Sequence, residues 1–352
     1  MINNTIQSLL CQQFLFYFSK YYVKIITVIN MYKVTVDKNS DGQRADKFIK
    51  KILPLAPNSF IYKMFRKKDV KVNGVRIKED TFVYEGDVME LFLYEDKVKE
   101  FQEEVSIEHL AVQFEVVYED EHILVVNKPA GLILHEDDKE KKNTLANQVL
   151  SYLYQKGEYD PKTSQGFIPG PVHRLDRNTS GLVIFGKTFS ALKDLNEMVR
   201  LRHCIKKEYV TIVSGELKSD QHLVGYMKKD EQKQLCFMVS KNTPGALTME
   251  TKYKVLRHNR EFSYIEVELI TGRTHQIRLH MASTNHPVIG DRKYGNFEVN
   301  KMVKNKYGLN HQLLHAYRIT FTKPIGCLKY LTGKTIEAPA KGLFSEILQD
   351  LF

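Results

Sequence analysis

Pro171-Val-His-Arg-Leu-Asp-Arg-Asn-Thr-Ser-Gly-Leu-Val-Ile-Phe-Gly-Lys187 is the stretch from which the fold can best be predicted. It places one carboxylate, Asp176, between Arg174 and Arg177, and an apolar segment typical of a buried strand begins at Gly181. The two arginines favour the charged form of Asp176, and a strand at this point would fix the loop that carries it. Asp176 is therefore a candidate nucleophile, although an ordinary surface ion pair would explain the short string His-Arg-Leu-Asp equally well.

A second polar cluster lies far along the chain. Thr271-Gly-Arg-Thr-His-Gln-Ile-Arg-Leu-His280 holds two arginines, two histidines and a glutamine, and it follows an alternating, strand-like stretch at 262–270. Many hydrogen-bond donors at the end of a strand suit a site for an anionic ligand.

Together these segments resemble the RluA-type family of RNA pseudouridine synthases. Residues 172–187 look like the catalytic-aspartate motif of that family, residues 271–280 look like its arginine motif, and Lys207-Glu-Tyr209 lies where the family places its active-site tyrosine. The resemblance spans about residues 113 to 345 in collinear order, and its further matches are 124–132, 286–295 and 314–316. Asn178 stands where the family very often has Asp, a mild departure that leaves the nucleophile and its flanking arginine intact.

The resemblance implies three catalytic residues. Asp176 would be the catalytic aspartate, acting either on carbon 6 of the uracil or on the ribose. Tyr209 would stack against the target uracil and assist proton removal, although as the first residue of a strand it would also suit the core. Arg278, next to the apolar Ile277, would pair with Asp176 and keep it charged, with Arg273 the less favoured candidate for that pairing.

The same resemblance implies contacts with the RNA substrate. A base inside a helix must be flipped out before it can react, and Arg174 would fill the gap that it leaves. His173 and His275 would shape the site or contact the RNA backbone, or have a purely structural role. The residues expected at the substrate are therefore His173, Arg174, Arg177, Arg273, His275 and Ile277.

Composition agrees with an RNA-binding protein. The 352 residues are enough for about two domains, and a hydrophobic fraction of 43% with 27% charged residues is typical of a soluble globular chain. The formal net charge of +10 indicates a polyanionic partner. The four cysteines (11, 204, 236 and 327) are scattered, which favours a reduced, cytoplasmic setting. His275 and His280 have no acidic or cysteine partner at a familiar interval, so neither a metal nor another cofactor is expected.

The basic residues are concentrated near the N-terminus. Residues 44–78 contain eleven lysines and arginines but only two acids, Asp46 and Asp69. Apolar residues recur there at helical spacing on both sides of Pro54 and Pro57, Asn58-Ser59 could cap the second helix, and residues 70–77 form an expected hairpin around an Asn-Gly turn. Residues 44–93 resemble the small alpha-L RNA-binding motif. This resemblance implies phosphate contacts by Arg44, Arg66, Lys67 and Lys68, whereas the alternative is a solvated basic helix.

These patterns predict an α+β fold. The catalytic domain would contain a mixed, largely antiparallel sheet with peripheral helices, preceded by a small alpha-L domain. We expect an N-terminal extension at 1–30, the alpha-L domain at 31–94, an acidic linker at 95–112 and the pseudouridine synthase domain at 113–352. Residues 1–30 are apolar in patches, but Lys20 and Lys24 interrupt them, so neither a membrane span nor a signal peptide is expected. A weakly membrane-touching segment is the alternative there.

The expected activity is the isomerisation of specific uridines to pseudouridine. An appended RNA-binding module with this catalytic domain most resembles the RluC-like branch, which acts on large-subunit ribosomal RNA, and the protein would be a cytoplasmic monomer. Transfer RNA is an alternative substrate, and a non-catalytic RNA-binding or ribosome-assembly protein is an alternative class. A hydrolase that uses Ser180 or a histidine metal site is a further alternative, but Ser180 has no G-x-S-x-G elbow around it.

Overall fold

The computed structural model describes residues 31–102, 107–138, 140–161, 164, 167–230, 232 and 234–352. The extension expected at 1–30 lies outside the described residues. The chain divides into two compact units, residues 1–106 with 161–167, and residues 107–160 with 168–352. Each unit is described by itself.

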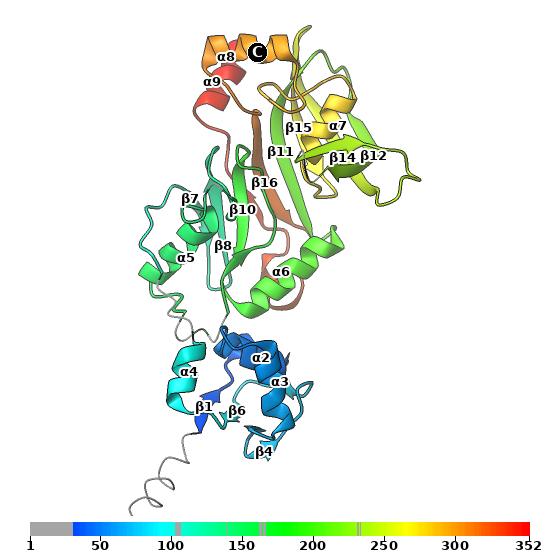
Figure 1. Cartoon of the computed structure of the whole chain (residues 1–352). Helices are drawn as coiled ribbons and strands as arrows, with labels where there is room; N and C mark the ends of the chain where they lie inside the picture. Colours follow the sequence, from blue (N-terminus) through cyan, green and yellow to red (C-terminus); the bar gives the residue numbers. More distant parts are fainter. Residues whose placement is uncertain are drawn as a thin grey trace, which may run out of the picture. The chain divides into compact units, whose positions relative to one another are not determined.

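The N-terminal unit packs two short helices, α2 (Ala45–Ile52) and α3 (Asn58–Arg66), beside small sheets (Figure 1). One sheet has the strand order β1-β6-β3-β4, and β2 pairs with β5. Asn73 and Gly74 both have positive φ, at 50° and 78°, and close the expected hairpin between β3 and β4. The strands are β1 (Tyr32–Thr35), β2 (Gln43–Arg44), β3 (Val70–Val72), β4 (Val75–Arg76), β5 (Phe82–Val83) and β6 (Val88–Leu91), and a 3-10 turn, η1, covers Lys38–Ser40.

Two local features of this unit differ from the sequence expectation. Pro57 is the N-cap of α3, so neither Asn58 nor Ser59 caps it. The segment expected as an acidic linker begins with a helix, α4 (Glu95–Phe101), whose Val98 and Phe101 are buried in the core of this unit. The charged residues between and around these two apolar side chains hid the helical spacing.

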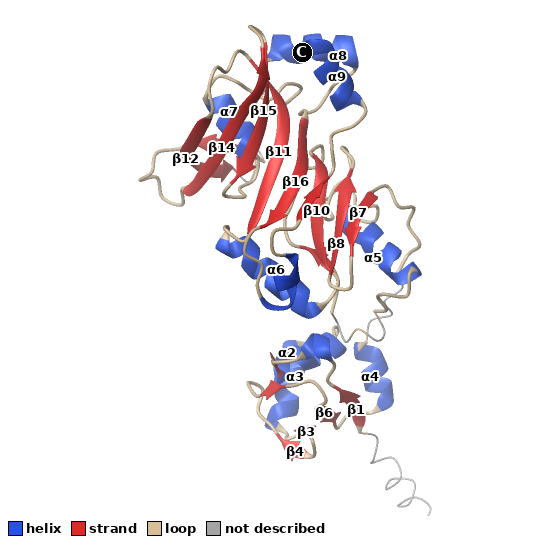
Figure 2. Ribbon diagram, turned by 180° about the vertical axis from the view of Figure 1, so that it is seen from behind, coloured by secondary structure: helices blue, strands red, loops and turns tan. Residues whose placement is uncertain are grey.

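The second unit is built on one large sheet, seen from behind in Figure 2. Its strand order is β13-β12-β14-β15-β11-β16-β10-β8-β7, with β17 added on β16 and β9 on β10. Of its described pairings, only that of β10 with β16 is parallel, which confirms the mixed, largely antiparallel sheet. The strands are β7 (Glu115–Glu119), β8 (Ile123–Lys128), β9 (Gly170–Pro171), β10 (Ser180–Gly186), β11 (Ile205–Ser214), β12 (Gln221–Asp230), β13 (Leu235–Met238), β14 (Leu247–His258), β15 (Phe262–Leu269), β16 (Leu314–Phe321) and β17 (Thr335–Glu337).

Helices lie around this sheet, and three of them start at a side-chain cap. Thr144, Thr188 and Asn296 each accept a hydrogen bond from the backbone N–H three residues later. The helices are α5 (Leu145–Gln155), α6 (Phe189–Leu201), α7 (Gln276–Ser283), α8 (Phe297–Tyr307) and α9 (Leu343–Leu351), with a 3-10 helix, η2, at Gly326–Leu331. In the part of the chain that the structure describes, no helix combines the length and apolar character that crossing a bilayer requires.

Strand β10 is buried on both faces and therefore holds the preceding loop in place. Val183 and Phe185 pack in the cluster that contains Tyr209, whereas Leu182 and Ile184 pack in a second cluster with side chains of α6. Gly181, at the start of the strand, has a φ of +112° and lies so close to β16 that an added Cβ would be 2.2 Å from the carbonyl oxygen of Ala316. Glycine is thus required for the close approach of the two parallel strands.

Candidate active site

Asp176 lies in the loop between β9 and β10, and a buried lysine fixes this loop. Lys128, at the end of β8, is fully buried, and its Nζ donates to the carbonyl oxygens of Leu132 at 2.8 Å, Arg177 at 2.9 Å and Pro129 at 3.0 Å. Burial lowers the pKa of Lys128 to about 7, while the charge of Asp176 acts in the opposite direction. Lys128 therefore ties the loop to β8 through backbone groups.

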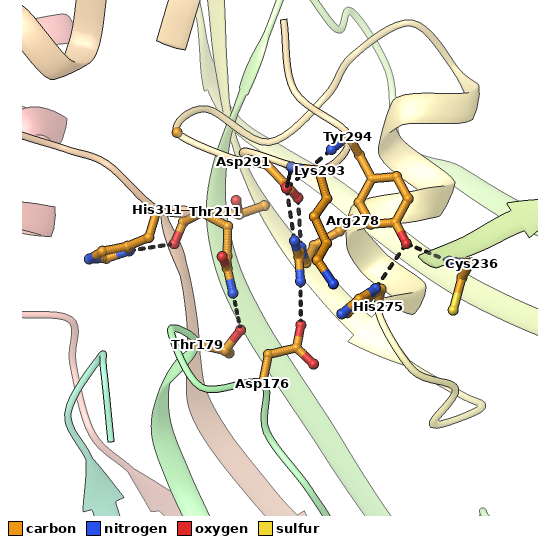
Figure 3. Close-up of polar contacts among 12 residues, drawn as sticks. Asp176, Thr179, Thr211, Cys236, His275, Arg278, Asp291, Lys293, Tyr294 and His311 are labelled. Atoms are coloured by element: carbon orange, nitrogen blue, oxygen red, sulfur yellow. Dashed lines mark hydrogen bonds and ion pairs between the residues drawn. The ribbon is translucent and has the colours of Figure 1, made fainter. Parts of the chain in front are cut away.

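The Asp176 side chain, which is 27% exposed, meets Arg278 from α7 (Figure 3). Nη1 of Arg278 donates to Oδ2 of Asp176 at 2.8 Å, so the pair expected from the sequence is present. The other nitrogens of Arg278 are occupied by Asp291, with Nε 2.6 Å from Oδ2 and Nη2 2.8 Å from Oδ1. A bidentate pair of this kind fixes the plane of the guanidinium group. Asp291 therefore aims Arg278 at Asp176.

The buried half of this arrangement is electrostatically balanced. Burial alone would raise the pKa of Asp291, but Arg278 and the backbone N–H groups of Lys293 and Tyr294 outweigh it and lower that pKa. Burial would lower the pKa of Arg278, yet Asp291 and Asp176 raise it above the ordinary value. Both groups therefore stay charged at neutral pH, as a buried pair must if it is to be stable.

Tyr209 comes from β11 and is 4% exposed, in the same apolar cluster as Ile277. Burial and the charge of Asp176 both raise the pKa of the Tyr209 hydroxyl. The side chain is therefore a neutral phenol near the candidate carboxylate. From the sequence, Tyr209 could lie either in the core or in the site, and its position meets both descriptions.

A second aromatic ring, Tyr294, borders Arg278. The guanidinium carbon of Arg278 is 5.3 Å from the centre of this ring. The Tyr294 hydroxyl accepts from the backbone N–H of Cys236 and lies 2.8 Å from Nδ1 of His275. His275, with φ 54°, is the N-cap of α7, and burial lowers its pKa to about 4. His275 thus links the start of α7 to this aromatic residue.

The three residues of the Asp176 loop that were expected at the substrate have different surroundings. His173 accepts a hydrogen bond at Nε2 from the backbone N–H of Ile184, and burial, with the charge of Lys207, lowers its pKa to about 3. Arg177 pairs with Asp137 at 2.6 Å, away from Asp176. Arg174 is exposed, and within the described ranges no hydrogen bond or ion pair is recorded for its side chain. Neither flanking arginine pairs with Asp176, because Arg278 takes that place.

In the arginine segment, Arg273 is only loosely held. Its Nε donates to the carbonyl oxygen of Thr248 at 3.2 Å, and its backbone N–H donates to Gln276. Ile277 is 4% exposed and packs in the core. Of the two arginines in this segment, Arg278 is the one that reaches Asp176, as the apolar residue before it had favoured.

The four basic residues singled out in the N-terminal unit also differ. Arg44 makes a bidentate pair with the buried Asp46, at 3.1 and 3.0 Å. Arg66, Lys67 and Lys68 are exposed together at the end of α3. The last three side chains form the patch that is open to a ligand.

Ser180, weighed above as a hydrolase nucleophile, contacts a histidine. Its Oγ lies 2.8 Å from Nδ1 of His315, whose Nε2 lies 2.7 Å from the carbonyl oxygen of Ala338. Since a carbonyl oxygen can only accept, Nε2 carries the proton and the serine donates to Nδ1. His315 is 4% exposed, and a backbone carbonyl takes the position that a carboxylate occupies in a catalytic triad. The pair joins the parallel strands β10 and β16.

Three residues of the site were not assigned a role from the sequence. Asp291 and Tyr294 lie in the segment 286–295, which was matched to the family only as a block, and Lys128 ends an apolar strand. A lysine within a strand, two positions after four apolar residues, is a signal that could have identified Lys128, because lysine is rarely buried without partners. Among the described residues, no three His, Cys, Asp or Glu side chains gather as a metal site would need.

The chain is similar to known proteins over most of its length. Residues 122–283 match the family described as RNA pseudouridylate synthase. The chain is 33% identical over 294 residues to an uncharacterized RNA pseudouridine synthase of Mycoplasma genitalium, covering 83% of this chain and 89% of that protein. It is 32% identical over 325 residues to ribosomal large subunit pseudouridine synthase C of Escherichia coli K12, covering 90% of this chain and 96% of that one.

A solved structure shows the same fold. Human RNA pseudouridylate synthase domain containing 4 superposes with a TM-score of 0.52 at 21% identity, covering 67% of this chain and 92% of that one. The residues matched by the family include both Asp176 and Arg278. Sequence identity above 30% extends over nearly the whole length of the two relatives. The chain belongs to the RluA-type family of RNA pseudouridine synthases.

Proposed function

We propose that this protein isomerises specific uridines of large-subunit ribosomal RNA to pseudouridine, with Asp176 as the catalytic carboxylate. The observation that carries the proposal is the chain of contacts from Asp291 through Arg278 to Asp176, beside the ring of Tyr209. The choice of RNA is supported by the relatives from Escherichia coli and Vibrio vulnificus, which are ribosomal large subunit pseudouridine synthases.

The reaction needs a single negative group that is held still. The bond between N1 of uracil and C1′ of ribose breaks, the base turns, and C5 bonds to C1′. C5 then loses its proton and N1 gains one, so atoms and charge balance without an oxidant, a reductant or ATP. The ionised Asp176 would add to C6 of the base or act at C1′ of the ribose. Arg278 would keep the carboxylate ionised and aimed during either course.

The neighbouring residues would hold the flipped base and its surroundings. The neutral ring of Tyr209 would stack on the uracil and assist the removal of the C5 proton. The exposed Arg174 would fill the gap in the RNA helix, because flipping a base costs a few kcal/mol that a substitute contact can offset. We assign Arg177, Arg273, His173, Ile277 and His275 to the walls of this site.

The N-terminal unit would bind the same RNA. Its exposed Arg66, Lys67 and Lys68 suit phosphate contacts, and Arg44, paired with Asp46, would position the start of α2. The division into an alpha-L domain at 31–94, a linker at 95–112 and a catalytic domain at 113–352 is part of this proposal. So are the cytoplasmic location, the monomeric state and the absence of a cofactor.

Two alternatives would leave different traces. A non-catalytic RNA-binding protein would have no need for a carboxylate that is held in place by Arg278 and its buried partner, Asp291. A synthase that modifies transfer RNA would keep the site but would act on other molecules. A comparison of the modified RNAs separates the two.

The test is a map of pseudouridine across all RNAs in a strain that lacks this gene, complemented with the wild type or with Asp176→Asn. Asparagine keeps the shape of the side chain but removes its charge, so RNA affinity is expected to stay close to that of the wild type. We expect one or a few ribosomal sites to disappear and to return only with the wild type. If Asp176→Asn restored the missing pseudouridines, the catalytic assignment would be refuted. If the missing pseudouridines lay in transfer RNA, transfer RNA would be the substrate. A map that is the same with and without the gene would favour the non-catalytic alternative.

A further inference from the structure

Lys207 lies on the same face of β11 as Tyr209. Side chains alternate along a strand, and on the opposite face Lys206 pairs with Glu208 at 2.7 Å. Lys207 and Tyr209 are two residues apart and therefore point to the side on which Asp176 is found. This lysine is thus directed toward the candidate active site.

Two neighbours locate the amino group of Lys207 more closely. Its charge contributes to the lowered pKa of His173, which lies three residues before Asp176. Its Nζ is 4.0 Å from the point where a Cβ on Gly272 would be. His173 belongs to the loop that carries Asp176, and Gly272 belongs to the loop that leads to Arg278. The amino group therefore lies between these two loops.

Lys207 has no carboxylate partner among the residues that the structure describes. No ion pair and no hydrogen bond of its Nζ is seen there, although the side chain is partly buried. Burial, together with the charge of Arg202, lowers the pKa of Lys207 to about 8. A partly buried cation without a partner is unfavourable, and an anion that binds beside it would remove this cost.

Four other cations around the site are already engaged, whereas Arg174 is exposed and Arg273 makes one hydrogen bond to a backbone carbonyl. Arg278 is paired with two aspartates, and Arg177 is paired with Asp137. The Nζ of Lys128 donates to three carbonyl oxygens, and that of Lys293 donates to Gln234 at 2.7 Å. Of the basic side chains on the two loops and on β11, Lys207 is thus well placed to meet an anion of the substrate.

We propose that Lys207 binds a backbone phosphate next to the target uridine. This inference rests on the proposed function, because uracil is uncharged and phosphates are the anionic groups of RNA. A flipped nucleotide brings its own phosphates to the mouth of the site, between the loops where Lys207 lies. The missing side chain at Gly272 leaves space beside the amino group, because a Cβ at that position would lie 4.0 Å from Nζ, at van der Waals contact.

The test combines a protein change with an RNA change. Lys207→Met keeps most of the length of the side chain and removes its charge, and Lys207→Arg keeps the charge. The RNA carries a single methylphosphonate, which is uncharged, either 5′ or 3′ of the target uridine. Dissociation constants and kcat/KM are measured for each protein with each RNA. Lys252→Met is the matched control, because Lys252 is exposed on the opposite face of the sheet.

We expect one of the two methylphosphonates to weaken binding by the wild type and by Lys252→Met about tenfold, which is about 1.4 kcal/mol. Lys207→Met should bind natural RNA about tenfold more weakly and lose nothing further with that methylphosphonate. Lys207→Arg should retain most of the affinity and the sensitivity. Circular dichroism and the affinity of Lys207→Arg check that the fold is intact.

If the methylphosphonate weakened RNA binding by Lys207→Met as much as it weakens binding by the wild type, Lys207 and the phosphate would act independently. That result would overturn the inference. So would a fall in kcat without any change in sensitivity to the methylphosphonate, which would point to an effect on Asp176 or on the base. Affinity can be measured without turnover, so the coupling is testable even if no pseudouridine forms. A failure of the proposed function and a failure of this contact are therefore distinguishable.

Discussion

Arg278 contacts Asp176 through a single nitrogen, with Nη1 2.8 Å from Oδ2, although the two residues are 102 positions apart in the chain. The remaining donors that face inward bind Asp291. The direction of the bond to Asp176 is thus set by a third residue that does not touch Asp176. Asp291 is a positioning residue for the proposed reaction.

Replacement of Asp291 by asparagine should lower turnover more than RNA affinity. The amide cannot accept from both guanidinium nitrogens, so Arg278 loses its fixed plane and Asp176 is less well aimed. We expect kcat to fall on the order of a hundredfold, the effect of a misplacement of about 1 Å, while Kd stays close to that of the wild type. Single-turnover kinetics and RNA titration measure the two quantities.

Asp137→Asn is the control for this change. It removes the pair with Arg177, whose two side chains are about half exposed, and such pairs contribute about 1 kcal/mol or less. Turnover by Asp137→Asn should remain near that of the wild type. If Asp291→Asn turned over RNA at the wild-type rate, the positioning role would be wrong.

Gly181→Ala should destabilise the protein and displace the loop of Asp176. The added Cβ would lie 2.2 Å from the Ala316 carbonyl oxygen, and the φ of +112° is strained for alanine. We expect a loss of more than about 2 kcal/mol in the free energy of unfolding, together with a loss of activity. Urea denaturation measures the first.

Gly333→Ala separates backbone strain from the clash. Gly333 also has a positive φ, of +75°, but nothing lies within 4 Å of the Cβ that would be added. This variant should lose only about 1 kcal/mol and keep its activity. Equal losses in the two variants would mean that the contact between β10 and β16 is unimportant.

The sequence predicted the parts of the molecule that depend on local pattern. The apolar run after Asp176 gave β10, the alternation at 262–270 gave β15, and the Asn-Gly pair gave the hairpin between β3 and β4. The pair of Arg278 and Asp176 was inferred from family resemblance, since no local rule brings residues 102 positions apart together.

The remaining features depend on tertiary structure. Asp291 is aimed at Arg278 only after α7 and the loop before α8 have packed together, and Lys128 finds its three carbonyl acceptors only in the folded loop. Helix α4 was missed because only two apolar side chains, Val98 and Phe101, face its core. Arg177 was expected to favour the charged form of Asp176, but it forms its ion pair with Asp137.

Three histidines predict a loss of stability in mild acid. Burial lowers the pKa of His173 to about 3 and those of His275 and His280 to about 4. In the unfolded chain each ring takes up a proton near its ordinary pKa of about 6.5. The stabilising contribution is therefore complete above pH 6.5 and is lost as the pH falls toward about 4, with a slope of about 1.4 kcal/mol per pH unit for each histidine.

His280→Gln tests this directly. His280 is 2% exposed, and its Nδ1 lies 2.8 Å from Oγ1 of Thr251. Glutamine does not titrate, so the slope of unfolding free energy against pH between 6.5 and 4 should fall by about one proton equivalent. His203→Gln, at an exposed position, is the matched control. A slope equal to that of the wild type in His280→Gln would show that the ring is not held neutral.

Asp291 makes the stability of the folded state depend on pH in a second, more acidic range. Its lowered pKa means that the folded state resists protonation, so this contribution is present above the ordinary pKa of 3.8 and disappears as the pH falls below it. The unfolding free energy of Asp291→Asn should therefore depend on pH less steeply below about pH 4, by up to one proton equivalent. Asp291→Asn and the wild type must be compared at the same salt concentration, because screening weakens the ion pairs at the surface.

The last prediction concerns the basic patch formed by Arg66, Lys67 and Lys68. Changing all three to alanine should weaken RNA binding and should also reduce its salt dependence. Each lost phosphate contact removes about 0.7 to 0.9 from the slope of log Kd against log salt concentration, so the loss of three contacts would lower the slope by about 2 to 2.7. The measurement is a titration of RNA at several salt concentrations. Lys97 and Lys99 are the control positions, because both pair with glutamates on α4. The variant with alanine at both positions should keep the wild-type slope. If the slope changed equally in this variant and in the triple variant, the effect would come from net charge and not from phosphate contacts of the patch.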